Sequence, residues 1–172
     1  MKHVIPAIFI LITGFVLQTA LFSRISFGGI VPNILVLLAA AYGFMYGDKA
    51  GLFMGFFGGL MADVFFGSFL GLNAVILMYI GYLNGKFNRF YYEEDIKLPL
   101  VLIVVSDLAY GGLYYFVMFL LRGRFDLKYY FMKIMLPELV YTVLVALVYY
   151  PLLLLLYRIL HAPKNGGDIS FV

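Results

Sequence analysis

Six long apolar runs, separated by short polar loops, constrain this chain more than any other feature of its sequence. They cover residues 4–22, 31–46, 50–66, 70–87, 98–121 and 137–157. Hydrophobic residues make up 65% of the chain and charged residues 12%, whereas ordinary soluble domains contain about 45–50% and about 25%. A soluble fold could not bury this much apolar surface, so we expect lipid to surround most of the chain.

The apolar runs predict helices. A helix needs about 20 apolar residues to cross the hydrocarbon core of a bilayer, and a backbone exposed to lipid must satisfy its own hydrogen bonds. The strands of a membrane barrel would alternate apolar and polar residues, which these runs do not do. We therefore predict an all-α, polytopic membrane protein in which residues 1–172 form a single domain of about six transmembrane helices.

The positive charges suggest an orientation in the membrane. With six spans, both ends of the chain lie on the same side. If that side is the cytoplasm, it holds Lys2, Lys49, Lys86, Arg89, Lys97, Arg158 and Lys164, and the other side holds Arg24, Arg122, Arg124, Lys128 and Lys133. Lys and Arg are enriched in cytoplasmic loops, so we predict cytoplasmic N- and C-termini. The net charge of +3 indicates this orientation rather than a nucleic-acid-binding patch.

The sequence argues against an enzyme. It has no Cys, and its two His residues, His3 and His161, lie near opposite ends, so no His/Cys cluster has metal-ligand spacing. No GxSxG motif is present, no Gly-rich phosphate-binding loop opens a helix, and neither intramembrane Asp lies in a GxGD motif. We expect no catalytic residues, metal or cofactor.

A stripe of glycines marks the third run. Gly47, Gly51, Gly55 and Gly59 recur every four residues, and Asp63 continues the series. Small residues at this spacing let two helix backbones approach closely. The stripe therefore predicts a helix-packing face, either for another helix of this chain or for the transmembrane helix of a partner.

Two acids inside the apolar runs invite both structural and functional interpretations. Asp63, near the end of the third run, could cap the next segment or reach headgroup water, or it could anchor a partner or ligand. Asp107 lies in the middle of the fifth run, where no Lys or Arg is at matching depth. We expect its carboxyl to be protonated or hydrogen-bonded to Ser106, Asn73 or a Tyr. Buried acids in membranes are candidates for function.

Two further polar residues lie near predicted helix starts. Glu138 follows Pro137 at the start of the sixth run, where the helix dipole favours a carboxylate. Asn73 follows the turn formed by Gly67–Gly71. We expect both side chains to cap helices.

The stretch from Gly47 to Gly85 resembles the core of the rod shape-determining protein MreD family. That family carries a pattern of the form G…GF..GL..D…..LGLNA…..IGYL.G across its third and fourth helices. The matching positions here are Gly55, Phe56, Gly59, Leu60, Asp63, Leu70, Gly71, Leu72, Asn73, Ala74, Gly81, Tyr82 and Gly85. The family's Pro-Asp-Leu-like start of the second helix is Pro32–Asn33 in this chain.

The resemblance implies a non-enzymatic component of the bacterial inner membrane that helps to maintain rod shape during cell-wall elongation. It also implies association with MreC, a single-span protein, and through it with MreB and the wall-synthesising transpeptidase and glycosyltransferase. It implies a fold similar to the substrate-binding subunits of energy-coupling-factor transporters. The glycine stripe and its neighbours, Gly51, Gly55, Gly59, Asp63, Gly71 and Asn73, are then the candidate positions for docking the partner helix.

The alternative is a substrate-binding membrane subunit of a vitamin or metabolite transporter. Such a subunit shares the predicted size and helix number, but it needs convergent polar groups that line a pocket. Asp63, Asn73, Asp107 and Gln18 are the candidates that lie deep enough, which is a sparse set for a polar ligand.

Overall fold

The computed structural model describes residues 4–22, 24–25, 29–67, 69–90, 96–117 and 127–161. Every element of regular secondary structure in these ranges is a helix, which confirms the predicted all-α class. Four helical stretches are long and apolar enough to cross a membrane: Ile5–Phe22, Asp48–Phe66, Lys97–Tyr115 and Lys128–Leu160. The chain is therefore a polytopic membrane protein.

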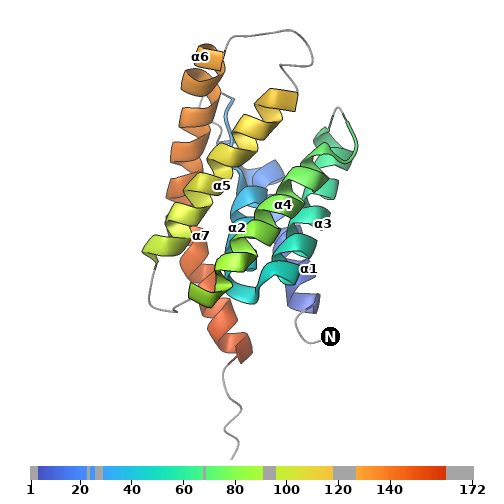
Figure 1. Cartoon of the computed structure of the whole chain (residues 1–172), viewed down its shortest axis with the longest axis vertical. Helices are drawn as coiled ribbons and strands as arrows, with labels where there is room; N and C mark the ends of the chain where they lie inside the picture. Colours follow the sequence, from blue (N-terminus) through green and yellow to red (C-terminus); the bar gives the residue numbers. More distant parts are fainter. Residues whose placement is uncertain are drawn as a thin grey trace, which may run out of the picture.

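The helices overlap the six predicted runs (Figure 1), and the end of the fifth run, residues 118–121, lies outside the described residues. The elements are α1 (Val4–Val16), α2 (Ile34–Tyr46), α3 (Asp48–Phe66), α4 (Leu72–Lys86), α5 (Lys97–Tyr115), α6 (Leu127–Tyr130) and α7 (Leu136–His161). A π-helical segment, Leu17–Phe22, extends α1, and a second one, Phe131–Met135, joins α6 to α7. A 3₁₀ turn, Phe87–Phe90, follows α4.

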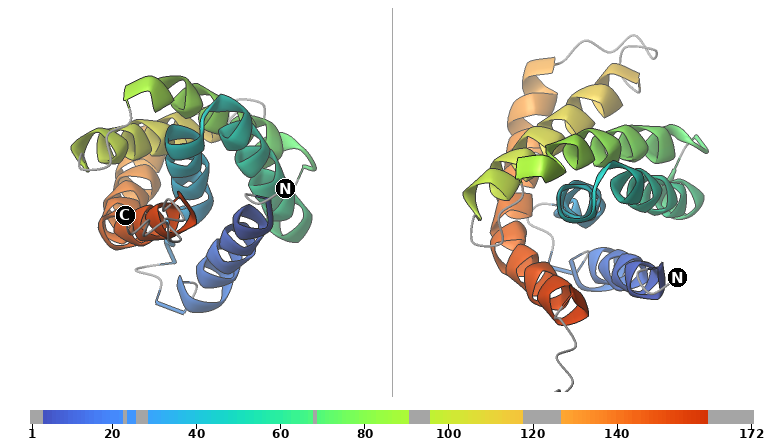
Figure 2. Two further views of the ribbon diagram at one scale, coloured as in Figure 1. Left: turned by 90° about the horizontal axis from the view of Figure 1, so that it is seen from below. Right: turned by 60° about the horizontal axis from the view of Figure 1, so that its bottom comes forward.

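Helix α2 forms the centre of the bundle, with the other long helices around it (Figure 2). All of its residues from Ile34 to Met45 are buried, and they are apolar on every side, as is typical of a helix enclosed by protein. With 13 residues it is about 20 Å long, which is shorter than the hydrocarbon core of about 30 Å. Helix α4, with 15 residues, is also short. The crossing of the bilayer by α2 and α4 therefore stays a prediction.

The last helical run begins earlier than predicted. Pro137 was expected near the start of the sixth helix, but the helical backbone already begins at Leu127. The π-helical segment Phe131–Met135 ends two residues before Pro137. Proline cannot donate the backbone hydrogen bond of a regular helix, and a π-helical turn shifts that bonding pattern locally. Pro137, which the sequence suggested as a helix start, therefore marks a local irregularity within a longer helical run. Pro151 lies inside α7.

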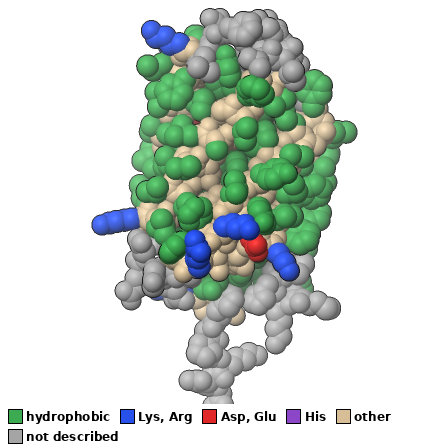
Figure 3. Space-filling model, viewed as in Figure 1, with side chains coloured by type: hydrophobic (Ala, Val, Ile, Leu, Met, Phe, Trp, Pro, Cys, Tyr) green, Lys and Arg blue, Asp and Glu red, His purple; other side chains and the backbone are tan. Residues whose placement is uncertain are grey.

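Apolar side chains cover the body of the bundle, and charged side chains lie toward its ends (Figure 3). The start of α1 and the end of α7 lie at the same end (Figure 1), as six passes require. That end also carries four exposed basic residues at helix termini: Lys49, Lys86, Arg89 and Lys97. Which end faces the cytoplasm stays a prediction.

Candidate functional site: two buried polar clusters and an apolar groove

The glycine stripe of α3 packs against α4 of the same chain. A Cβ atom on Gly55 would overlap the backbone of Leu77, and one on Gly59 would overlap the backbone of Asn73 and Ala74. Gly51 approaches the backbone of Gly81 in the same way. The glycine stripe therefore packs α3 against α4 within the chain, which is the first of the two interpretations. Helix α4 covers the surface on which a partner helix was expected to dock.

Asp63 lies at the end of this stripe, 2% exposed. Its Oδ2 accepts backbone N–H groups from Gly71, at 3.0 Å, and Ala74, at 3.0 Å, and its Oδ1 accepts the N–H of Asn73 at 3.1 Å. Gly71 has φ +98°, a left-handed conformation that glycine adopts without strain. The carboxylate therefore caps the first turn of α4, where free N–H groups and the helix dipole favour a negative charge.

Asn73 has a different role from the predicted one. Its side chain does not cap α4, because Gly71 is the capping residue and the N–H groups of this turn bond to Asp63. Instead, the Asn73 Oδ1 accepts a hydrogen bond of 2.7 Å from the hydroxyl of Tyr110 on α5. Asp63, Asn73 and Tyr110 therefore form a first polar cluster, which connects α3, α4 and α5. Sequence reasoning did not single out Tyr110.

A second polar cluster lies where the start of α2 meets α7. Asn33 caps α2, since its Oδ1 accepts the N–H of Val36 at 3.2 Å. The Asn33 side chain also donates to Glu138 Oε1 at 3.3 Å, and its backbone N–H donates to Thr142 Oγ1 at 3.0 Å. The Thr142 hydroxyl in turn donates to the carbonyl of Glu138 at 2.9 Å. Glu138 thus accepts a hydrogen bond from Asn33, the residue that caps α2. The position of Glu138 at the start of α7 did not predict this partner.

Asp107 of α5 belongs to this second cluster. It is 6% exposed, and its Oδ1 has no hydrogen-bond partner among the described residues. Its carboxyl group lies within hydrogen-bond reach of the Thr142 side chain. Two of the partners expected from the sequence bond elsewhere: Ser106 accepts from Asn84 at 2.8 Å, and Asn73 accepts from Tyr110.

Most of the polar side chains that could bind a transported ligand form hydrogen bonds within the protein. Gln18 accepts the backbone N–H of Leu35 through its Oε1 at 3.2 Å, so it secures the extension of α1 to the start of α2. Asp63 and Asn73 are bonded as described above. Asp107 alone of the four candidates keeps a buried oxygen without a partner in the described structure.

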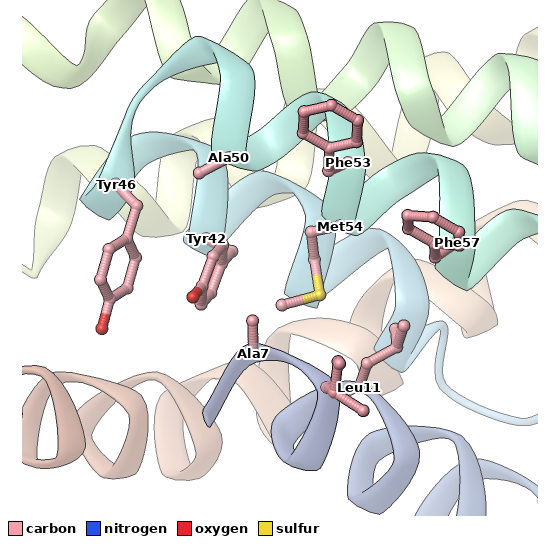
Figure 4. Close-up of a pocket in the computed structure, with 9 residues that line it drawn as sticks. Ala7, Leu11, Tyr42, Tyr46, Ala50, Phe53, Met54 and Phe57 are labelled. Carbon is pink, nitrogen blue, oxygen red and sulfur yellow. The ribbon is translucent and has the colours of Figure 1, made fainter. Parts of the chain in front are cut away.

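An apolar groove of about 590 Å³ opens between α1, α2 and α3 (Figure 4). Ala7 and Leu11 of α1 form one wall, and Phe53 and Met54 of α3 form the other. Tyr42 of α2 lies between them. No group of three or more His, Cys, Asp or Glu side chains that could hold a metal occurs in the part of the chain that the structure describes. The lining of the groove is apolar apart from the hydroxyls of Tyr42 and Tyr46, so the groove is suited to an apolar occupant.

A family model described as rod shape-determining protein MreD matches residues 1–160. No curated protein and no solved structure matches. The match extends the resemblance beyond the motif of α3 and α4 to the second half of the chain, including the residues of both polar clusters. The expected similarity to transporter subunits stays a prediction.

Proposed function

The chain belongs to the rod shape-determining protein MreD family, and we propose that it is a non-enzymatic membrane scaffold that binds an MreC-type single-span protein. Its membership establishes a role in rod shape determination. Through MreC, the chain would connect to MreB and to the transpeptidase and glycosyltransferase that extend the cell wall. The family match over residues 1–160 is the observation on which this proposal rests.

The architecture supports a scaffold that acts through contacts. The described helices are joined by short connections, such as Gly47 between α2 and α3 and residues 67–71 between α3 and α4. The surface that such a protein offers consists of helix faces and short loops. A partner is therefore bound within the membrane or directly at its surface.

We assign the partner helix to the groove between α1 and α3. The glycine stripe is covered by α4, whereas the groove is open and apolar, and two of its walls belong to the candidate spans Ile5–Phe22 and Asp48–Phe66. Ala7 and Ala50 on opposite walls (Figure 4) are small, and small residues allow helices to approach closely in a membrane. A single apolar transmembrane helix, as in MreC, has the chemistry that this lining requires.

Co-purification tests the function. The tagged chain is co-expressed with MreC from the same organism, extracted in mild detergent and analysed by size-exclusion chromatography. We expect the two proteins to elute together in a fixed ratio. Elution of a monodisperse chain without MreC, under conditions that preserve other membrane complexes of the same cells, would contradict the proposal.

Substitution in the groove tests the assigned surface. Ala7→Phe places a ring in the groove from α1, and we expect it to lower the amount of co-purified MreC at least tenfold, about 1.4 kcal/mol of binding free energy. Val148→Phe is the matched control, because Val148 lies on α7, 68% exposed and away from the groove. Both variants are checked by circular dichroism. Equal MreC recovery with both variants would place the partner helix elsewhere.

A further inference from the structure

Helix α1 closes the apolar groove at one end only. The buried ring of Phe15 lies 5.2 Å from the ring of Phe65 and 6.0 Å from that of Phe66, both at the end of α3. A Cβ atom on Gly14 would overlap a side chain of α2, so the two helices are in close contact there. None of the side chains of residues 5–9 is buried. The groove is therefore closed where α3 ends and open where α1 and α3 begin.

The open end of the groove carries polar groups. The rings of Tyr42 and Tyr46 are stacked with centroids 4.2 Å apart, and both hydroxyls point away from α2, to the side on which α1 and α7 lie (Figure 4). The ring of Tyr157 on α7 packs edge-on against Tyr46 at 5.0 Å. A tyrosine hydroxyl both donates and accepts hydrogen bonds. The groove therefore changes from an apolar interior to a hydrogen-bonding mouth.

Two cations lie beside this mouth. Lys49 is exposed and lies one turn before Phe53, a lining residue of α3, and residues four apart share a helix face. Arg158 is exposed near the end of α7. Asp48, the acid at the start of α3, lies on a different face of that helix, where its backbone packs against Gly85 of α4. The groove side of α3 thus presents a positive charge at the mouth.

We propose that the groove binds an anionic phospholipid when no partner helix occupies it. One acyl chain lies between α1 and α3, and the phosphate lies at Tyr46, Lys49 and Arg158. The order of polarity in such a lipid matches that of the groove, and basic pockets between transmembrane helices bind anionic headgroups. The volume of about 590 Å³ is within the range of about 300–1,000 Å³ for small-molecule sites.

The lipid site would regulate partner binding. The partner helix is assigned to the same groove, so the lipid must leave before that helix can dock. This competition rests on the proposed function, whereas the lipid site itself depends only on the shape and the charge of the groove.

Tryptophan fluorescence tests the lipid site, because the chain has no tryptophan of its own. Phe57→Trp places one in the groove, and Val148→Trp places one on an exposed face of α7 away from it. Each variant is reconstituted into vesicles of phosphatidylcholine and phosphatidylglycerol in which one of the two lipids has brominated acyl chains, which quench tryptophan on contact. We expect Phe57→Trp to prefer phosphatidylglycerol by about fivefold, the effect of one nearby cation. Val148→Trp should show no preference.

Charge reversal at the mouth tests the headgroup contact. In the Phe57→Trp background, Lys49→Glu and Lys49→Gln should each remove the preference for phosphatidylglycerol. Lys133→Glu is the matched control, because Lys133 is exposed and precedes α7, at the opposite end of that helix from Arg158. Equal quenching by the two lipids in Phe57→Trp would overturn the proposal. A preference that survives both substitutions of Lys49 would also overturn it.

Addition of MreC tests the competition separately. MreC whose own tryptophans are replaced by phenylalanine is reconstituted together with Phe57→Trp, and we expect the preference for phosphatidylglycerol to disappear. If MreC binds and the preference persists, lipid and partner do not compete for the groove. If MreC does not bind at all, the proposed function fails, while the lipid site is still decided by the quenching measured without MreC.

Discussion

Replacing Gly55 with leucine is expected to prevent α3 and α4 from packing and to abolish the folded protein. Overpacking costs about 1–3 kcal/mol when neighbouring side chains can shift. At Gly55 the obstacle is the backbone of Leu77 and Met78, so the two helices themselves must separate. We therefore expect a loss above that range, measured as the yield of monodisperse protein and as the Tm in mild detergent.

Gly112→Leu is the control for this substitution. Gly112 lies on α5, and a Cβ atom added there meets no atom within 4 Å, so we expect the yield and Tm of the unmodified chain. The comparison also separates the two interpretations of the glycine stripe. If Gly55→Leu folds with an unchanged Tm and loses only MreC, the stripe docks a partner, and the packing of α3 on α4 is not its main purpose.

Local patterns in the sequence predicted the features that depend on local chemistry. Apolar runs predicted the helices, because hydropathy alone decides whether a segment can lie in lipid. The spacing of Gly51, Gly55 and Gly59 predicted a close helix contact, because small residues four apart share a face. Asp63 was expected to cap the next segment as one of its interpretations, since it lies just before a glycine-rich turn and a new helix.

The second polar cluster could not be predicted in the same way. Asn33 bonds to Glu138 and Thr142 across 105 and 109 residues of sequence, and no local pattern encodes which helices become neighbours. Asp107 was identified as a buried acid, but Glu138 of the same cluster was interpreted only as a cap of its own helix. That α4, rather than a partner helix, covers the glycine stripe likewise depends on tertiary packing.

Removing the carboxylate of Asp63 is expected to destabilise the bundle by disrupting the start of α4. In Asp63→Ala, three backbone N–H groups lose their acceptor, and a buried donor without a partner costs about 1–3 kcal/mol. We expect a total loss of about 3 kcal/mol or more. Asp63→Asn keeps one acceptor oxygen but turns an NH₂ group toward the same donors, so its loss should be intermediate. Unfolding by a denaturing detergent, followed by circular dichroism, gives the order of stability.

Asp48→Asn separates this capping role from a general effect of removing an acid near a helix start. Asp48 accepts the N–H of Lys49 at 2.8 Å, a bond that an asparagine oxygen can keep, so this variant should be as stable as the unmodified chain. The Asp63 series also tests function, because the capping interpretation requires partner binding to fall in step with stability. If Asp63→Asn is fully stable and no longer retains MreC, the carboxylate acts as an anchor for the partner.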